Sequence, residues 1–202
     1  MKRFLKAAVA ATVLAAGSAS ALAANVSFTG HLAAANDVQL FNFTLNATSN
    51  VTLRTWSYAG GVNAAGSVIG AGGFDPIVSL FFGSGSTALL IGASDDGFGV
   101  ATDSSTGSAL DSLLDSFGLG AGTYTVALTQ SANFANGPTL ADGFLGAGNP
   151  GFDGRSSTWA LDFRGVSTAT AVPEPTTLVL GLLGLVAMGA TRRRESVAAL
   201  SA

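Results

Sequence analysis

The stretch Val38-Gln39-Leu40-Phe41-Asn42-Phe43-Thr44-Leu45 decides the fold. Its apolar residues Phe41, Phe43 and Leu45 alternate with the polar residues Asn42 and Thr44. Successive side chains of a β-strand point to opposite faces, so this period of two predicts a strand with one buried face. A protein built from such segments needs a second apolar layer to cover that face.

Similar short segments recur on both sides of this stretch. They are rich in β-branched and aromatic residues and are separated by Gly, Asn and Ser. We expect further strands at residues 26–29, 51–58, 77–82, 89–93, 123–130 and 158–164. The strands at 38–45 and 51–58 are expected to form a hairpin, because only a short turn cluster separates them. Residues 110–117 fit either a short helix or an irregular strand.

Two long connections are rich in glycine. Residues 59–73 are expected to form a flexible loop. Residues 131–157 contain Phe134, Phe144 and Phe152, and these rings are expected to lie back on the sheet. Seven or eight short strands without a long amphipathic helix predict an all-β fold, namely a β-sandwich over residues 24–167.

The start of the chain, residues 1–23, has the pattern of a secretory signal peptide. Lys2, Arg3 and Lys6 precede an apolar run at 7–16, and Ala21-Leu22-Ala23 fits a cleavage site with small residues at Ala21 and Ala23. A first transmembrane helix is the alternative, but the apolar run is short for one. We therefore expect export from the cytoplasm and a mature chain that begins near Ala24.

The last thirty residues combine three unlike features. Val172, Pro173, Glu174 and Pro175 lie in an expected linker, residues 168–175, which the prolines keep out of a helix. Residues 176–190 are apolar and predict a transmembrane helix of roughly 22 Å, against a hydrocarbon core of about 30 Å. The tail, residues 191–202, carries Arg192, Arg193 and Arg194, which belong on the cytoplasmic side of a membrane. A buried core helix with a basic end is the alternative.

This order of box, short helix and arginine cluster resembles the Pro-Glu-Pro C-terminal (PEP-CTERM) sorting domain of Gram-negative bacteria. The resemblance covers about residues 172–195. It implies that an exosortase, a membrane-embedded processing enzyme, acts on the protein. The protein would then lie transiently in the inner membrane before it reaches the cell surface or the medium, in a setting of exopolysaccharide and biofilm.

The body of the chain resembles a second family, the bacterial pre-peptidase C-terminal-type surface domains. The segments that carry this resemblance are residues 36–45, 73–81, 94–97 and 121–128. It implies a jelly-roll-like sandwich that is not catalytic. Some members of that family bind calcium or polymeric ligands.

The body is acidic once the two ends are set aside. Between residues 24 and 172 stand three arginines and ten aspartates, a net charge of −7. Such a surface repels phosphate backbones, so no nucleic-acid partner is expected. The chain has no cysteine, and therefore no disulfide can stabilise it.

The sequence lacks the members of the common catalytic sets. His31 is the single histidine, cysteine is absent, and the first glutamate is Glu174. Nucleophilic triads and zinc sites therefore have no complete set of residues. We expect a protein that is not an enzyme, with a hydrolase as the least favoured alternative.

Calcium is the one cofactor that the composition allows. Asp95, Asp96, Asp75 and Asp111 fall in turn segments that a sandwich could bring to one end. Carboxylate oxygens are the ligands that calcium prefers. The alternative interpretation is that Asp and Gly fill turns for backbone reasons alone.

Three aromatic residues bear on ligand binding. Trp56, Tyr58 and Trp159 are candidates for a sugar-stacking platform, although Trp56 and Trp159 stand in strand alternation, which favours packing in a core. The function expected from the sequence is a structural or adhesive surface protein of the exopolysaccharide matrix. The alternative is a binding module for a glycan or a protein, with or without calcium.

Overall fold

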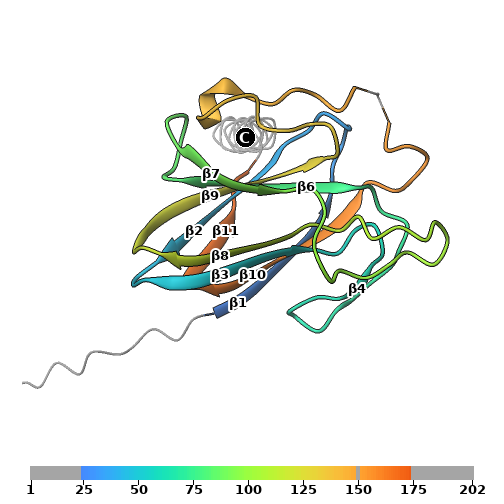
Figure 1. The fold of residues 1–202 in the computed structure, drawn as a ribbon, viewed down its shortest axis with the longest axis horizontal. Helices are drawn as coiled ribbons and strands as arrows, with labels where there is room; N and C mark the ends of the chain where they lie inside the picture. The colour runs from blue at the N-terminus through green and yellow to red at the C-terminus, as the bar shows by residue number, and fades with distance from the viewer. Residues whose placement is uncertain (1–23, 149–150, 174–202) are drawn as a thin grey trace, which may run out of the picture.

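A computed structural model describes residues 24–148 and 151–173 (Figure 1). The predicted signal peptide, Glu174 and Pro175 of the box, the predicted transmembrane helix and the basic tail lie outside these residues. Within the described ranges, no helix is long and apolar enough to span a membrane.

The described part of the chain is all-β. Its elements are β1 (Ala24–His31), β2 (Gln39–Leu45), β3 (Ser49–Thr55), β4 (Gly61–Val62), β5 (Val68–Ile69), β6 (Pro76–Phe82), β7 (Leu89–Ser94), β8 (Leu113–Leu119), β9 (Gly122–Gln130), the 3₁₀ turn η1 (Leu140–Asp142), β10 (Thr158–Val166) and β11 (Thr168–Ala171).

These strands form two main antiparallel sheets. One has the order β1-β10-β3-β8 and the other β11-β2-β9-β6-β7, while β4 and β5 form a small hairpin outside both. The pairs are nested, since β1 pairs with β10, β2 with β9, β3 with β8 and β6 with β7. A long hairpin rolled up in this way is a jelly roll, with β11 added at the edge beside β2. The predicted all-β, jelly-roll-like sandwich is confirmed in these residues.

The predicted hairpin of residues 38–45 and 51–58 is wrong. β2 lies in the five-stranded sheet and β3 in the four-stranded sheet, so residues 46–48 cross between the layers. The physical reason is that each of the two strands has one apolar face, and these two faces pack against each other. Phe41 and Phe43 face Val51 and Leu53 across one core, which two strands of a single hairpin could not do.

The structure also decides two segments whose conformation the sequence left open or predicted as a loop. Residues 110–117, which fitted a helix or a strand, contribute most of strand β8, an edge strand paired with β3. The predicted flexible loop 59–73 contains the β4–β5 hairpin. One glycine there is sterically required, because a Cβ on Gly61, at φ +142°, would lie 2.5 Å from the Trp56 ring.

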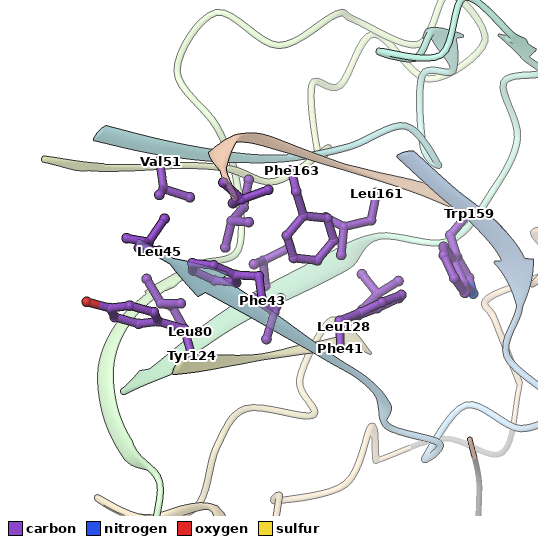
Figure 2. Packing of buried hydrophobic residues seen from close by; sticks show 14 of the residues in the cluster. Phe41, Phe43, Leu45, Val51, Leu80, Tyr124, Leu128, Trp159, Leu161 and Phe163 are labelled. Atoms are coloured by element: carbon purple, nitrogen blue, oxygen red, sulfur yellow. The ribbon is translucent and has the colours of Figure 1, made fainter. Parts of the chain in front are cut away.

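The core lies between the two sheets and packs aromatic rings among leucine and valine side chains (Figure 2). Phe163 of β10 meets Phe43 of β2 with ring centroids 6.0 Å apart, and Phe41 meets Trp159 at 5.7 Å. Phe43 stacks on Tyr124 at 4.9 Å. The first two contacts join opposite sheets, so aromatic residues of β2 and β10 hold the layers together, while the Phe43–Tyr124 stack lies within the five-stranded sheet.

The connection from β9 to β10 covers the outer face of the five-stranded sheet. Phe144 packs against a second cluster around the buried Phe81 and Ala127, and Phe152 packs against the main core. Both positions confirm that this loop folds back on the sheet. Phe134 does not follow the prediction, since it remains 38% exposed.

The two ends of the sandwich differ. Four long connections, residues 32–38, 56–75, 95–112 and 131–157, lie at the end where β2 and β6 begin. The opposite end carries only the short turns 46–48, 83–88 and 120–121 and residue 167. We call the first of these the long-loop end, and it lies on the right in Figure 1. The candidate functional residues lie there.

Candidate functional site

The chain leaves the sandwich at the long-loop end, through β11. This strand pairs antiparallel with β2, with Thr168 opposite Thr44 and Ala171 opposite Phe41. The Thr44 and Thr168 hydroxyls are hydrogen-bonded at 2.7 Å. The expected linker from residue 168 is therefore wrong over 168–171, because the Thr-Ala-Thr-Ala segment fills the open edge of the sheet. Only Val172 and Pro173 continue the described chain beyond the strand.

Two of the predicted calcium ligands lie on neighbouring strands at this same end. Asp75 directly precedes β6 and Asp95 directly follows β7. The Ser131 hydroxyl, just after β9, is hydrogen-bonded to both carboxyl groups. The structure thus brings Asp75 and Asp95 together around one hydroxyl, while Asp96 beside them is exposed.

The environment of Asp75 and Asp95 disfavours the charged form of both carboxyl groups. Burial, followed by the nearby charges of Asp95 and Asp96, raises the pKa of Asp75 to about 7. Burial and the charge of Asp96 also raise the pKa of Asp95. Oδ1 of Asp75 and Oδ1 of Asp95 are both buried without a hydrogen-bond partner. Two unpaired carboxylate oxygens in one place are costly unless a proton or a cation joins them.

Asp111, the fourth predicted ligand, has a different role. Its Oδ1 accepts hydrogen bonds from the backbone N–H groups of Ser57 at 2.7 Å and Tyr58 at 3.2 Å, and its Oδ2 accepts from Ala59 at 2.9 Å. The Thr55 hydroxyl donates to Oδ1 as well. Its oxygens are thus already used inside the fold, and the side chain is 2% exposed. Asp111 is a structural acceptor that fixes the chain after β3.

A second buried aspartate pairs with an arginine that the sequence analysis did not single out. Arg155 contacts Asp103 over 2.5 Å, donates through Nε to the Gly73 carbonyl and lies 3.6 Å above the Tyr58 ring. The hydrogen bond from Arg155, with those from Ser105, lowers the pKa of Asp103 to about 2. No local motif marks Arg155, because its partners come from distant loops.

The predicted sugar-stacking rings are not exposed. Trp56, Tyr58 and Trp159 have exposed fractions of 9%, 7% and 5%. The Trp56 indole N–H donates to Oδ2 of the fully buried Asp162 at 2.7 Å, and the β4–β5 hairpin covers the ring. Core packing, which the strand alternation of Trp56 and Trp159 favours, is therefore confirmed for these two residues, and Tyr58 is buried as well.

The described residues contain no group of three or more His, Cys, Asp or Glu side chains that could hold a metal ion. Asp75 and Asp95 therefore supply at most two carboxylates to any cation site, and further ligands must be other oxygen atoms. A cavity of about 300 Å³ lies beside Asp75, and its lining also includes Gln130, Tyr58 and Arg155 but not Asp95.

Comparison with known proteins bears on the C-terminal exit. A family model described as a PEP-CTERM protein-sorting motif matches residues 171–194. These residues are a PEP-CTERM motif. The PEP-CTERM motif begins at the last residue of β11 and implies exosortase processing and export to the cell surface by way of the membrane. A search of curated proteins found no match. The resemblance of the body to pre-peptidase C-terminal-type domains stays a prediction.

Proposed function

We propose that this chain is an exported, non-catalytic β-sandwich with a structural or adhesive role at the cell surface, in an exopolysaccharide matrix. The observation that carries the proposal is the PEP-CTERM motif at residues 171–194. The predicted signal peptide at residues 1–23 supports the same route, since it would supply the export step.

The position of the motif relative to the sandwich supports display at a membrane. β11 ends at Ala171, and the Val172 N–H still donates to the Leu40 carbonyl of β2. The Pro-Glu-Pro box therefore follows the folded domain after a single residue. A helix that begins at residue 176 would hold the long-loop end of the sandwich close to the membrane until processing.

A structural role is favoured over catalysis by what the buried polar residues do. Asp103 is engaged by Arg155, Asp111 by backbone N–H groups, and Asp162 by Trp56 and the backbone N–H of Ala64. These aspartates stabilise loops of the sandwich and present no free acid and base pair to a substrate. The buried state of the three rings also weakens the alternative of a glycan platform.

The test is a substitution in the sorting box. The variant with Pro173, Glu174 and Pro175 all changed to alanine is expressed in a bacterium that has an exosortase, beside the unchanged chain. We expect the unchanged protein at the cell surface or in the medium in shortened form. We expect the variant to accumulate in the inner membrane at its unprocessed length.

A matched control keeps the sandwich and alters a surface aspartate, with Asp115→Asn in the same expression strain. This control should be sorted like the unchanged chain. Equal processing of the triple-alanine variant would overturn the proposal.

A further inference from the structure

Strand β1 is an edge strand with one open side. Among the strands that the structure describes it pairs with β10 alone, and it lies at the edge of the four-stranded sheet (Figure 1). Its register with β10 runs without a shift from Asn25 to His31. An edge of this length presents a row of main-chain N–H and C=O groups that can pair with a further strand.

The hydrogen bonds of β10 show which main-chain groups of β1 face the open side. The Ala160 N–H donates to the Trp56 carbonyl at 3.1 Å, and the Trp56 N–H donates to the Ala160 carbonyl at 2.9 Å. The main chain of Ala160 therefore faces away from β1, and its partner in the register, Thr29, faces away from β10. Since these groups alternate along a strand, the open edge is formed by Asn25, Ser27, Thr29 and His31.

The other three edges of the sandwich carry features that discourage strand addition. β8 contains Asp115 and has a register shift against β3, while β7 has a register shift against β6 and runs into Asp95. β11 is four residues long and is followed closely by Pro173. Charges, bulges, prolines and short length are the usual protections of an exposed edge. β1 has eight residues without a carboxylate, lysine, arginine or proline.

The sequence of β1 is complementary to itself when two copies run antiparallel. Its apolar side chains pack on the core, and its polar side chains alternate with them on the outer face. If Phe28 lies opposite Phe28 of a second copy, Ser27 lies opposite Thr29. In the same register Asn25 lies opposite His31. Apolar residues then meet on one face and polar residues on the other, so both faces of the sheet continue across the pair.

Charge also favours β1 as the contact between two copies. The body carries a net charge of −7, so two copies repel each other over most of their surface. On the neighbouring strand β10, Arg164 stands opposite Asn25. Asp162 stands opposite Ser27, but its carboxylate is fully buried and accepts a hydrogen bond from Trp56. The β1 edge therefore brings no exposed acid of its own to the contact.

Apolar surface lies beside the second half of the edge. An open cavity of about 480 Å³ is lined by Thr29 and His31 of β1 and by Val68 and Ile69 of the β4–β5 hairpin. Val68 is 82% exposed. A strand added to β1 would cover part of this surface.

We propose that β1 is a self-association site, through which two copies of this chain pair antiparallel with Asn25 of each opposite His31 of the other. The two four-stranded sheets would become one sheet of eight strands. Such an interface uses the same surface on both copies and closes as a two-fold dimer. It requires the folded sandwich and does not depend on exosortase processing.

The test places one cysteine at either end of β1 in a chain that has no other cysteine. Asn25→Cys and His31→Cys are purified separately as full chains in mild detergent, mixed while reduced and then oxidised. In the proposed register the Cα atoms of positions 25 and 31 lie about 5.5 Å apart across the interface, within disulfide range. Two copies of position 25 lie roughly 20 Å apart. We expect disulfide-linked dimers in the mixture and few from either variant alone.

A charge on the edge supplies the second measurement. Thr29→Lys alters an exposed side chain, so the variant should keep the Tm of the unchanged chain. It should raise the dissociation constant of the dimer, measured by analytical ultracentrifugation, by about tenfold or more, and should abolish the cross-link. Thr102→Lys is the matched control at an exposed threonine between β7 and β8, and it should change neither.

Three results would overturn the proposal. The first is a mixture that forms no cross-link. The second is cross-linking of Asn25→Cys alone as fast as in the mixture, which parallel pairing or random contact would give. The third is an unchanged dissociation constant in Thr29→Lys, because association through any other segment would survive that substitution.

Discussion

The backbone N–H of Val172 donates a hydrogen bond to the carbonyl oxygen of Leu40, with 2.9 Å between nitrogen and oxygen. The side-chain amide of Gln39 also donates to the Val172 carbonyl at 3.4 Å. Val172 is the first residue of the Val-Pro-Glu-Pro box, so pairing with β2 continues to the residue before Pro173. The folded sandwich and the PEP-CTERM motif thus share residues Ala171 and Val172.

This pairing predicts where a protease can cut the unprocessed chain. In limited proteolysis of the full chain from cells without an exosortase, we expect a resistant core that retains β11 and ends after Val172. Mass spectrometry of the core gives its end directly. Val172→Pro removes the donor N–H and should cost about 1 kcal/mol locally, so its core should be trimmed faster. A core of the unchanged chain that ended before Thr168 would contradict the pairing.

The Asp111 carboxylate predicts a large loss of stability on truncation. Asp111→Ala leaves three backbone N–H groups without their acceptor, those of the buried Ser57 and Tyr58 and of the half-buried Ala59. We expect the free energy of unfolding to fall by about 3–5 kcal/mol, measured by urea denaturation. Asp115→Asn, at an exposed position where the amide oxygen can still accept from the Thr52 hydroxyl, should change it by less than about 0.5 kcal/mol. A loss below about 1 kcal/mol for Asp111→Ala would show that these hydrogen bonds are replaced by others.

Asp75 predicts a specific dependence of stability on pH. Its pKa in the folded protein is about 7, above the ordinary 3.8, so the folded state holds this proton more tightly than the unfolded state. The contribution of Asp75 to stability is therefore full below about pH 4 and is lost as the pH rises towards 7. The lowered pKa of Asp103 acts in the opposite sense and at lower pH, because its contribution is lost as the pH falls through about 2.

The comparison that isolates Asp75 is Asp75→Asn against the unchanged chain, by urea unfolding in chelator at pH 5 and pH 8. We expect the variant to gain stability relative to the unchanged chain as the pH rises. Asp115→Asn should run parallel to the unchanged chain. Parallel behaviour of Asp75→Asn as well would refute the raised pKa.

The Trp56 indole predicts a stabilising role and not a binding role. Trp56→Phe keeps most of the ring volume but removes the N–H that donates to Asp162, whose carboxylate is fully buried. The free energy of unfolding should fall by about 1–3 kcal/mol. Binding of exopolysaccharide to the folded variant, measured by co-sedimentation, should equal that of the unchanged chain. A stable variant that failed to bind would restore the sugar-platform interpretation.

Sequence patterns were sufficient for the strands but not for their partners. The alternation of Phe41 and Phe43 with polar neighbours predicts a strand with one buried face, and β2 has that face. The same alternation cannot say which sheet the next strand joins, because residues 49–55 bury an equivalent face. The hairpin prediction therefore failed at the level of pairing. Thr168–Ala171 failed in a related way, since its short Thr-Ala repeat becomes a strand only because β2 leaves an edge to fill.

The candidate cation site was partly accessible from sequence. Asp75 and Asp95 stand at strand ends, and that position is visible in the chain. Asp111 also falls in a turn segment, but hydrogen bonds from Ser57 and its neighbours decide its role.

The most direct test of export and sorting is the intact mass of the protein recovered from the envelope and from the medium of a bacterium that has an exosortase. We predict a mass that lacks residues 1–23 and that is shortened at the PEP-CTERM motif, with the sandwich from Ala24 to Val172 complete. Recovery of all 202 residues from the cytoplasm, with neither end removed, would contradict this prediction.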